Sequence, residues 1–204
     1  KALGPEHPKV AMALNNLANL LEELGSYAEA RPLYEQSLAI LEKTLGPEHP
    51  YVALALNNLA SILKQQGSYA EAHPLYQRSL AIKEKTLGPE HLEVANSLNN
   101  LAVLLKIQGS YAEARPLYER ALAIREKAFG PEHPRVAVSL NSLAILLKEQ
   151  GSHADARLFY ERSLAIREKA LGPEHPDVGD SLNNLAILLK TQGSYAEARP
   201  LYER

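Results

Sequence analysis

Apolar side chains in the first part of the chain recur every three or four residues, which is the spacing of one face of a helix. The positions that follow this rhythm are Val10, Leu14, Leu17, Ala18, Leu21 and Leu24. Pro8 lies just before them, and proline suits the first position of a helix because it has no amide hydrogen to leave unpaired. Gly25 can adopt the left-handed conformation that ends a helix. The pattern therefore predicts a helix that begins at the His7-Pro8 pair and ends at Gly25.

A second apolar face follows Gly25 at once, with Tyr27, Ala30, Tyr34, Leu38, Leu41 and Leu45. Ser26 and Glu29 have the spacing of a capping box, in which both side chains bind the first unpaired amides of a helix. Gly46 and Pro47 end this second helix. Two helices joined by almost no loop fold as an antiparallel hairpin. Pro32 lies inside the second helix, where we interpret it as a slight kink; the alternative is that the helix is interrupted there.

The whole pattern repeats at a constant interval. The phrase Gly-Pro-Glu-His begins every 42 residues, at Gly4, Gly46, Gly88, Gly130 and Gly172. Residues 46–87 and 88–129 are identical at 29 of 42 positions. We therefore expect a single repeat domain over residues 1–204, with repeats 4–45, 46–87, 88–129, 130–171 and a truncated 172–204. Leu92 replaces the helix-starting proline in the third repeat, which should soften that junction without moving it. Because the chain opens on Lys1-Ala2-Leu3 and lacks an initial Met, we expect it to be a piece of a longer protein.

Composition narrows the class of protein. The 204 residues are 46% hydrophobic and 23% charged, and Leu, Ala, Ile and Val carry the apolar mass, which suits helices better than a β-rich fold. A net charge of -2 provides no field that would attract nucleic acid. The chain has no cysteine, no apolar run long enough to span a bilayer and no signal peptide. We therefore expect a soluble, cytoplasmic protein that binds neither nucleic acid nor membrane.

The spacing of the conserved-looking positions within each copy resembles a known repeat. Leu14-x-x-Leu17-Ala18-x-x-Leu21, followed by Gly25-x-Tyr27, Ala30-x-x-x-Tyr34 and Leu38, resembles the tetratricopeptide repeat over the entire chain. It departs from that pattern in having Leu14 in place of Trp, and Glu42 where the 34-residue unit usually closes with Pro. The 42-residue form, with Leu-Asn-Asn-Leu-Ala in the first helix, is similar to the kinesin light chain class of these repeats.

This resemblance implies an all-α fold, a right-handed superhelical solenoid of antiparallel helix pairs. It also implies a scaffold that binds an extended or short helical segment of a partner protein in a concave groove. Similar repeats occur in multidomain signalling ATPases, so the alternative is a sensor or structural repeat array of such a protein. We expect a monomer, with end-to-end self-association as the alternative, because the apolar end around Leu188, Leu189 and Tyr202 lacks a covering repeat.

Motifs for catalysis or cofactor binding are absent from the sequence. It contains no Gly-rich phosphate loop, no Gly-x-Ser-x-Gly elbow and no His-Glu-x-x-His helix, so we expect no enzyme and no cofactor. The repeated histidines, His7, His49, His91, His133 and His175, raise a metal hypothesis. Ligands of one zinc ion lie about 2 Å from it, whereas equivalent histidines lie one repeat apart. We therefore interpret them as residues at helix starts.

Asparagine recurs on the side of the first helix opposite Leu14. The series is Asn15, Asn57, Asn99, Asn141 and Asn183, and Asn16, Asn58 and Asn100 follow it at the margin of the same face. An amide offers a donor and an acceptor together, so these side chains are candidates for gripping the backbone of a bound peptide. The alternative is structural, with the Asn16 series joining one repeat to the next by hydrogen bonds.

Two further series lie on the same face. The first is basic, Lys64, Lys106, Lys148 and Lys190, and predicts a preference for peptides with acidic residues; the alternative is ordinary solvated lysines. The second is apolar, Val103, Ile145 and Ile187, and predicts a floor for a hydrophobic anchor in the second half of the groove.

Overall fold

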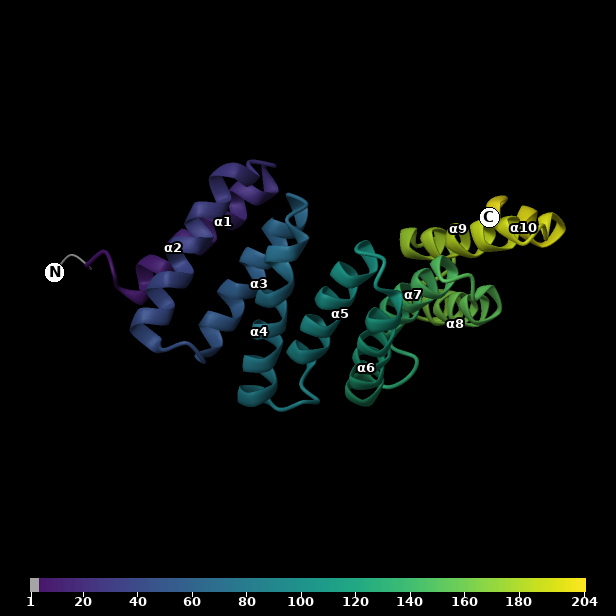
Figure 1. Ribbon diagram of the computed structural model, residues 1–204. Helices are drawn as coiled ribbons and strands as arrows, with labels where there is room; N and C mark the ends of the chain where they lie inside the picture. Colours follow the sequence, from purple (N-terminus) through teal and green to yellow (C-terminus); the bar gives the residue numbers. More distant parts are fainter. Residues whose placement is uncertain (1–3) are drawn as a thin grey trace. The chain divides into compact units, whose positions relative to one another are not determined.

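A computed structural model describes residues 4–204, and every regular element in that range is an α-helix (Figure 1). The helices are α1 (Pro8–Glu23), α2 (Tyr27–Leu45), α3 (Pro50–Gln65), α4 (Tyr69–Leu87), α5 (Leu92–Ile107), α6 (Tyr111–Phe129), α7 (Pro134–Glu149), α8 (His153–Leu171), α9 (Pro176–Thr191) and α10 (Tyr195–Tyr202). Odd-numbered helices are the first helix of each repeat, and even-numbered helices are the second. The predicted all-α array of helix pairs is confirmed.

The described residues form two compact units, of which the first ends at Leu104 and the second begins at Leu105. In the first unit, α2 packs against α1 of its own hairpin and against α3 of the next one. Ile40 and Leu41 of α2 share a buried cluster with Val52 and Leu56 of α3. In the second unit, α8 packs in the same way between α7 and α9. α2 and α8 are therefore each buried on two sides, and apolar contact with both neighbours stabilises them.

Histidine side chains begin the first helices. The Nδ1 atom of His7, His49, His91, His133 and His175 accepts a hydrogen bond of 3.1 Å from the backbone N–H two residues later. The side chain thus satisfies one of the amides that a helix start leaves unpaired. The predicted position at a helix start is confirmed. α5 begins at Leu92, in the same register as its proline-started equivalents, so that junction has not moved.

The capping box predicted at the start of the second helices is wrong. Ser26 makes no side-chain capping bond, and neither do its equivalents Ser68, Ser110, Ser152 and Ser194. Its backbone has ψ 55°, whereas the capping histidines have the extended ψ of about 140° that aims a side chain at the helix. The tight turn causes this difference, because the Ser26 N–H is held by the Leu21 carbonyl at 2.8 Å. The Ser26 carbonyl receives the N–H groups of Glu29 and Ala30 instead, both at 3.1 Å.

The interior proline does not interrupt the second helix. α2 continues from Tyr27 to Leu45 through Pro32, and α4 and α6 pass through Pro74 and Pro116 in the same way. Tyr34, two residues beyond Pro32, is completely buried. Packing of this side chain offsets the one backbone hydrogen bond that proline cannot donate.

The glutamate of the Gly-Pro-Glu-His phrase also forms an ion pair that closes the first, second and fourth hairpins. Glu6 pairs with Lys43 at the end of α2 at 2.5 Å, and Glu132 pairs with Lys169 at the end of α8 at 2.5 Å. Glu48 and Lys85 make the equivalent pair in the second repeat. These side chains are mostly exposed, so solvent screens each pair and its contribution to stability is small. The phrase therefore combines a helix stop, an ion pair and a helix cap.

Candidate peptide-binding surface

The two asparagine series form hydrogen-bonded pairs between successive first helices. In the first unit, Asn58 Nδ2 donates to Asn15 Oδ1 at 3.0 Å, and Asn100 Nδ2 donates to Asn57 Oδ1 at 2.9 Å. In the second unit, Asn184 Nδ2 donates to Asn141 Oδ1 at 3.0 Å. The structural alternative for the Asn16 series is therefore realised in these repeats. In the fourth repeat, Ser142 replaces the asparagine and donates to the Val138 carbonyl of its own helix at 3.1 Å.

Each pair keeps hydrogen-bonding capacity on its open side. The Asn15–Asn58 pair uses the oxygen of Asn15 and the nitrogen of Asn58, and both side chains are only partly buried. Within residues 4–204, no other group bonds to the Asn15 nitrogen or the Asn58 oxygen. A pair therefore presents one donor group and one acceptor group from two neighbouring helices. It can act on a peptide backbone as one amide would, but with a fixed geometry.

The lysine series has three different environments. Lys64 is half-buried, which lowers its pKa, and the nearby Glu22 carboxylate opposes that shift. Lys106 pairs with Glu149 at 3.2 Å, so its charge is already partly balanced. Lys148 is half-buried and Lys190 is exposed. The structure therefore does not present the four lysines as equivalent cations.

In the first repeat, the position of the apolar series lies beside a buried tyrosine that sequence reasoning did not connect with it. The first-repeat residue equivalent to Val103, Ile145 and Ile187 is Asn19. The Tyr34 hydroxyl donates to Asn19 Oδ1 at 2.6 Å and lies 2.8 Å from Glu22 Oε2. In the fourth repeat the position is Ile145, and the buried Tyr160 hydroxyl has no hydrogen-bond partner among the described residues. Burial raises the pKa of Tyr160 to about 12. Ile145 is partly buried, so only part of its side chain is open to a ligand.

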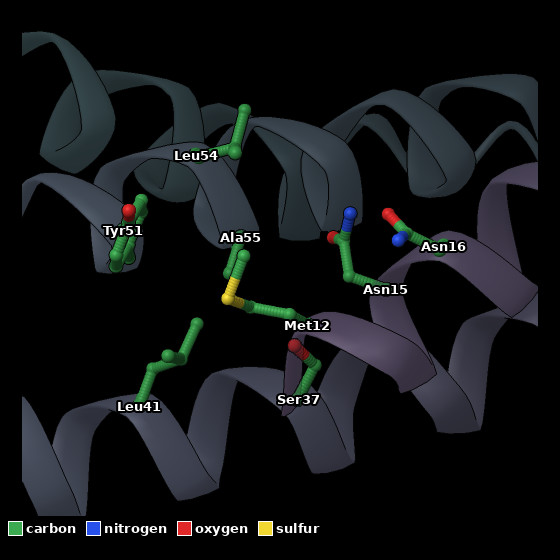
Figure 2. A pocket seen from close by; sticks show the side chains of 8 residues that line it. All are labelled: Met12, Asn15, Asn16, Ser37, Leu41, Tyr51, Leu54 and Ala55. Carbon is green, nitrogen blue, oxygen red and sulfur yellow. The ribbon is translucent and has the colours of Figure 1, made fainter. Parts of the chain in front are cut away.

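A small pocket lies between α1, α2 and α3, and the sequence analysis did not predict it (Figure 2). Its volume is about 80 Å³. The residues that line it are Met12, Asn15, Asn16, Ser37, Leu41, Tyr51, Leu54 and Ala55. The Ser37 hydroxyl is already bound to the Ala11 carbonyl at 2.8 Å. The only signal in the sequence was that Leu41, Tyr51 and Ala55 differ in character from their equivalents in later repeats.

Residues 4–204 contain no group of three or more His, Cys, Asp or Glu side chains placed to hold a metal ion. None of the described helices is long and apolar enough to cross a membrane.

Four overlapping segments of the chain, residues 9–85, 51–127, 93–169 and 159–204, match the sequence model of the tetratricopeptide repeat. The chain belongs to the tetratricopeptide repeat family. The resemblance of the residue pattern to the tetratricopeptide repeat is thus confirmed. Tetratricopeptide repeat folds are typical of protein–protein interaction scaffolds and are generally non-catalytic.

Solved structures of tetratricopeptide repeats resemble this chain closely. One is the structure of the nearly identical TPR-like repeats of a Podosopora anserina protein assigned as a kinesin light chain. It is 34% identical to this chain, with a TM-score of 0.86, and the match covers 97% of this chain and 93% of that chain. BtubC of P. vanneervenii has 26% identity and a TM-score of 0.84 over 97% and 78% of the two chains. PilF of Pseudomonas aeruginosa, with 20% identity and a TM-score of 0.69 over 96% and 74%, shares the fold alone. No curated protein sequence matches the chain significantly.

Proposed function

We propose that this chain is a non-catalytic interaction scaffold that binds an extended or short helical segment of a partner protein. The segment lies along the open side of the first helices, on α1 and α3 in one unit and on α7 and α9 in the other. The observation that carries the proposal is the set of asparagine pairs, which leave a donor and an acceptor on this side. The exposed apolar residues Met12, Leu54 and Val138 lie on the same helices, each 46–49% exposed.

The spacing of the pairs suits an extended chain. Packed helices lie about 8–10 Å apart, and an extended peptide rises about 3.3 Å per residue. About every third residue of a bound segment would therefore meet a new pair and could bond to it through its backbone. Backbone bonding of this kind supports the binding of segments with different side chains.

Side-chain selection belongs to the other positions. Lys64, Lys148 and Lys190 favour acidic residues in the partner, whereas Lys106 contributes less because Glu149 already pairs with it. Val103, Ile145 and Ile187 remain candidates for apolar contact. We also propose a cytoplasmic location, which the absence of cysteine supports.

A peptide-display selection followed by binding measurements tests this function. The informative variant is Asn57→Asp combined with Asn141→Asp, because aspartate keeps the oxygen that Asn100 and Asn184 bond to but removes the open nitrogen. We expect selected peptides to bind this variant about tenfold more weakly, which corresponds to about one lost hydrogen bond. The urea midpoint of the variant should remain that of the parent.

The control carries the same double charge change on the second helices, away from this side. Gln36→Glu combined with Gln77→Glu, two exposed positions on α2 and α4, should leave peptide affinity unchanged. The proposal is rejected if no peptide is selected, or if the aspartate variant binds every selected peptide as tightly as the parent chain does.

A further inference from the structure

The junctions between hairpins are polar in the later repeats. The position equivalent to Leu41 carries Lys83, Arg125 and Arg167, and the position equivalent to Ala55 carries Ser97, Ser139 and Ser181. In the second unit, Arg125 donates to the Ser139 hydroxyl at 2.5 Å, and Arg167 donates to the Ser181 hydroxyl at 2.9 Å. Arg167 also donates to the Asp177 carbonyl at 2.7 Å. There, a long cationic side chain extends from the second helix to the next first helix.

The first junction lacks this arrangement. Leu41 has no group that could reach across, and Ala55 has no hydroxyl to receive one. Two other lining residues are also apolar here and polar in the next repeat, where Glu93 replaces Tyr51 and Asn96 replaces Leu54. There, Glu93 pairs with Lys83 at 3.2 Å. The pocket of about 80 Å³ stands where the later junctions hold charged and polar side chains.

The pocket is apolar, and part of its lining is open to solvent. Met12, Tyr51 and Leu54 are 46%, 47% and 47% exposed, and no charged residue lines it. Figure 2 shows the Met12 side chain reaching toward Ala55, with Tyr51 and Leu41 on the opposite side of the space. Methionine adapts its shape readily, so Met12 can make room for an incoming group. An engineered cavity of about 150 Å³ takes a benzene ring, so this smaller volume suits an aliphatic side chain.

Amide groups stand at one edge of the same pocket. Asn15 keeps its nitrogen open, as described above, and Asn16 is exposed. Both side chains line the pocket, so its rim offers amides that can bond to a peptide backbone beside the apolar wall.

We propose that this pocket is the anchor site for one uncharged aliphatic side chain, Leu, Ile or Met, of an extended partner segment. The neighbouring backbone of that segment bonds to Asn15 and Asn16. The inference rests on the proposed peptide-binding function and assigns the main side-chain specificity to the first junction. A charged side chain is excluded there, because the lining offers it no counter-charge.

The test fills the pocket with the arginine and serine side chains that occupy the equivalent junction in later repeats. Leu41→Arg combined with Ala55→Ser reproduces the Arg125–Ser139 arrangement, which the fold demonstrably accommodates. We expect peptides selected on the parent chain to share one aliphatic position, and to bind the double variant at least about tenfold more weakly. Replacing that aliphatic residue by Ala should weaken binding to the parent by a similar factor, yet hardly affect binding to the variant. Leu158→Arg, an exposed leucine on α8, is the charge-matched control.

Met12 provides a direct reporter, because it is the only methionine in the sequence. Its ¹³C-labelled methyl group gives one NMR signal at the wall of the pocket. Titration with a selected peptide should change the chemical shift of this signal. The dissociation constant fitted to that change should equal the one measured for the complex by the binding assay. If peptides bind, depend on Asn57 and Asn141, and leave the Met12 signal and the double variant unaffected, the anchor site is wrong while the proposed function stands. If no peptide binds at all, both are wrong.

Discussion

The buried tyrosines of the second helices show how substitutions in a neighbouring helix change the environment of a hydroxyl. Tyr34 and Tyr160 occupy the same position of their repeats and are both buried. The Tyr34 hydroxyl bonds to Asn19 and Glu22, whereas the position equivalent to Asn19 is Ile145 in the repeat of Tyr160. A buried hydroxyl without a partner loses its bonds to water and gains nothing in return.

We therefore expect opposite effects from the same change at these two sites. Tyr160→Phe should leave the free energy of unfolding unchanged or raise it, because it removes an unsatisfied group. Tyr34→Phe should lower it by about 1–2 kcal/mol, because it removes a bond to a carboxylate. Urea denaturation followed by circular dichroism measures both values. Equal losses at the two sites would mean that the Tyr160 hydroxyl has a partner after all.

The same burial predicts how stability depends on alkaline pH. Burial raises the pKa of Tyr76, Tyr118 and Tyr160 from 10.0 to about 12. Between these values the unfolded chain has released protons that the folded chain still binds, so stability falls as pH rises. We expect the full stability below pH 10, and a decline from there through about pH 12. Urea midpoints measured across this range, compared with those of Tyr160→Phe, should show a shallower decline for the variant.

At the scale of a helix, the sequence predicted where the helices begin but not which side chains cap them. The histidine before each proline caps the first helix through Nδ1, although histidine is not among the residues usually preferred there. The serine that does match the preferred pattern caps nothing, because the glycine turn before it fixes its backbone. Residue type alone predicted where these helices begin, but the backbone angle at the cap decides which side chain bonds.

This difference gives a matched pair of substitutions in the second repeat. His49→Ala removes the bond to the Tyr51 N–H and should lower the free energy of unfolding by about 1 kcal/mol. His49→Asn should restore most of it, since asparagine is a good capping residue. Ser68→Ala should have almost no effect, because the Ser68 side chain makes no capping bond. A larger loss for Ser68→Ala than for His49→Ala, in thermal or urea unfolding, would contradict this assignment.

For the molecule as a whole, periodicity was sufficient to predict the fold and insufficient to predict the site. The 42-residue step and the apolar faces within it predicted the helices and the hairpins, because each repeat supplies the same apolar faces to its neighbours. The family was predicted from the resemblance of the residue pattern to the tetratricopeptide repeat. The asparagine series lies on the first helices, as the helical spacing predicted, but its pairing across the junction depends on distances that a sequence does not contain. The sequence did not predict the pocket, because three residues that differ from their equivalents in later repeats, Leu41, Tyr51 and Ala55, lie far apart in the sequence and line the pocket together only in the folded chain.

Packing between neighbouring helices also predicts how the molecule unfolds. Ile62 on α3 is completely buried, whereas its equivalent in the first repeat, Leu20 on α1, is 52% exposed. Ile62→Ala should therefore cost about 2–5 kcal/mol, and Leu20→Ala much less. In a repeat array each element depends mainly on its neighbours, so the loss should be greatest near α3. Hydrogen exchange followed by mass spectrometry should show faster exchange in α1–α4 of Ile62→Ala, with α7–α9 still protected. Equal acceleration along the entire chain would show that the two units unfold as one, and that neighbour contacts alone do not set the stability of each helix.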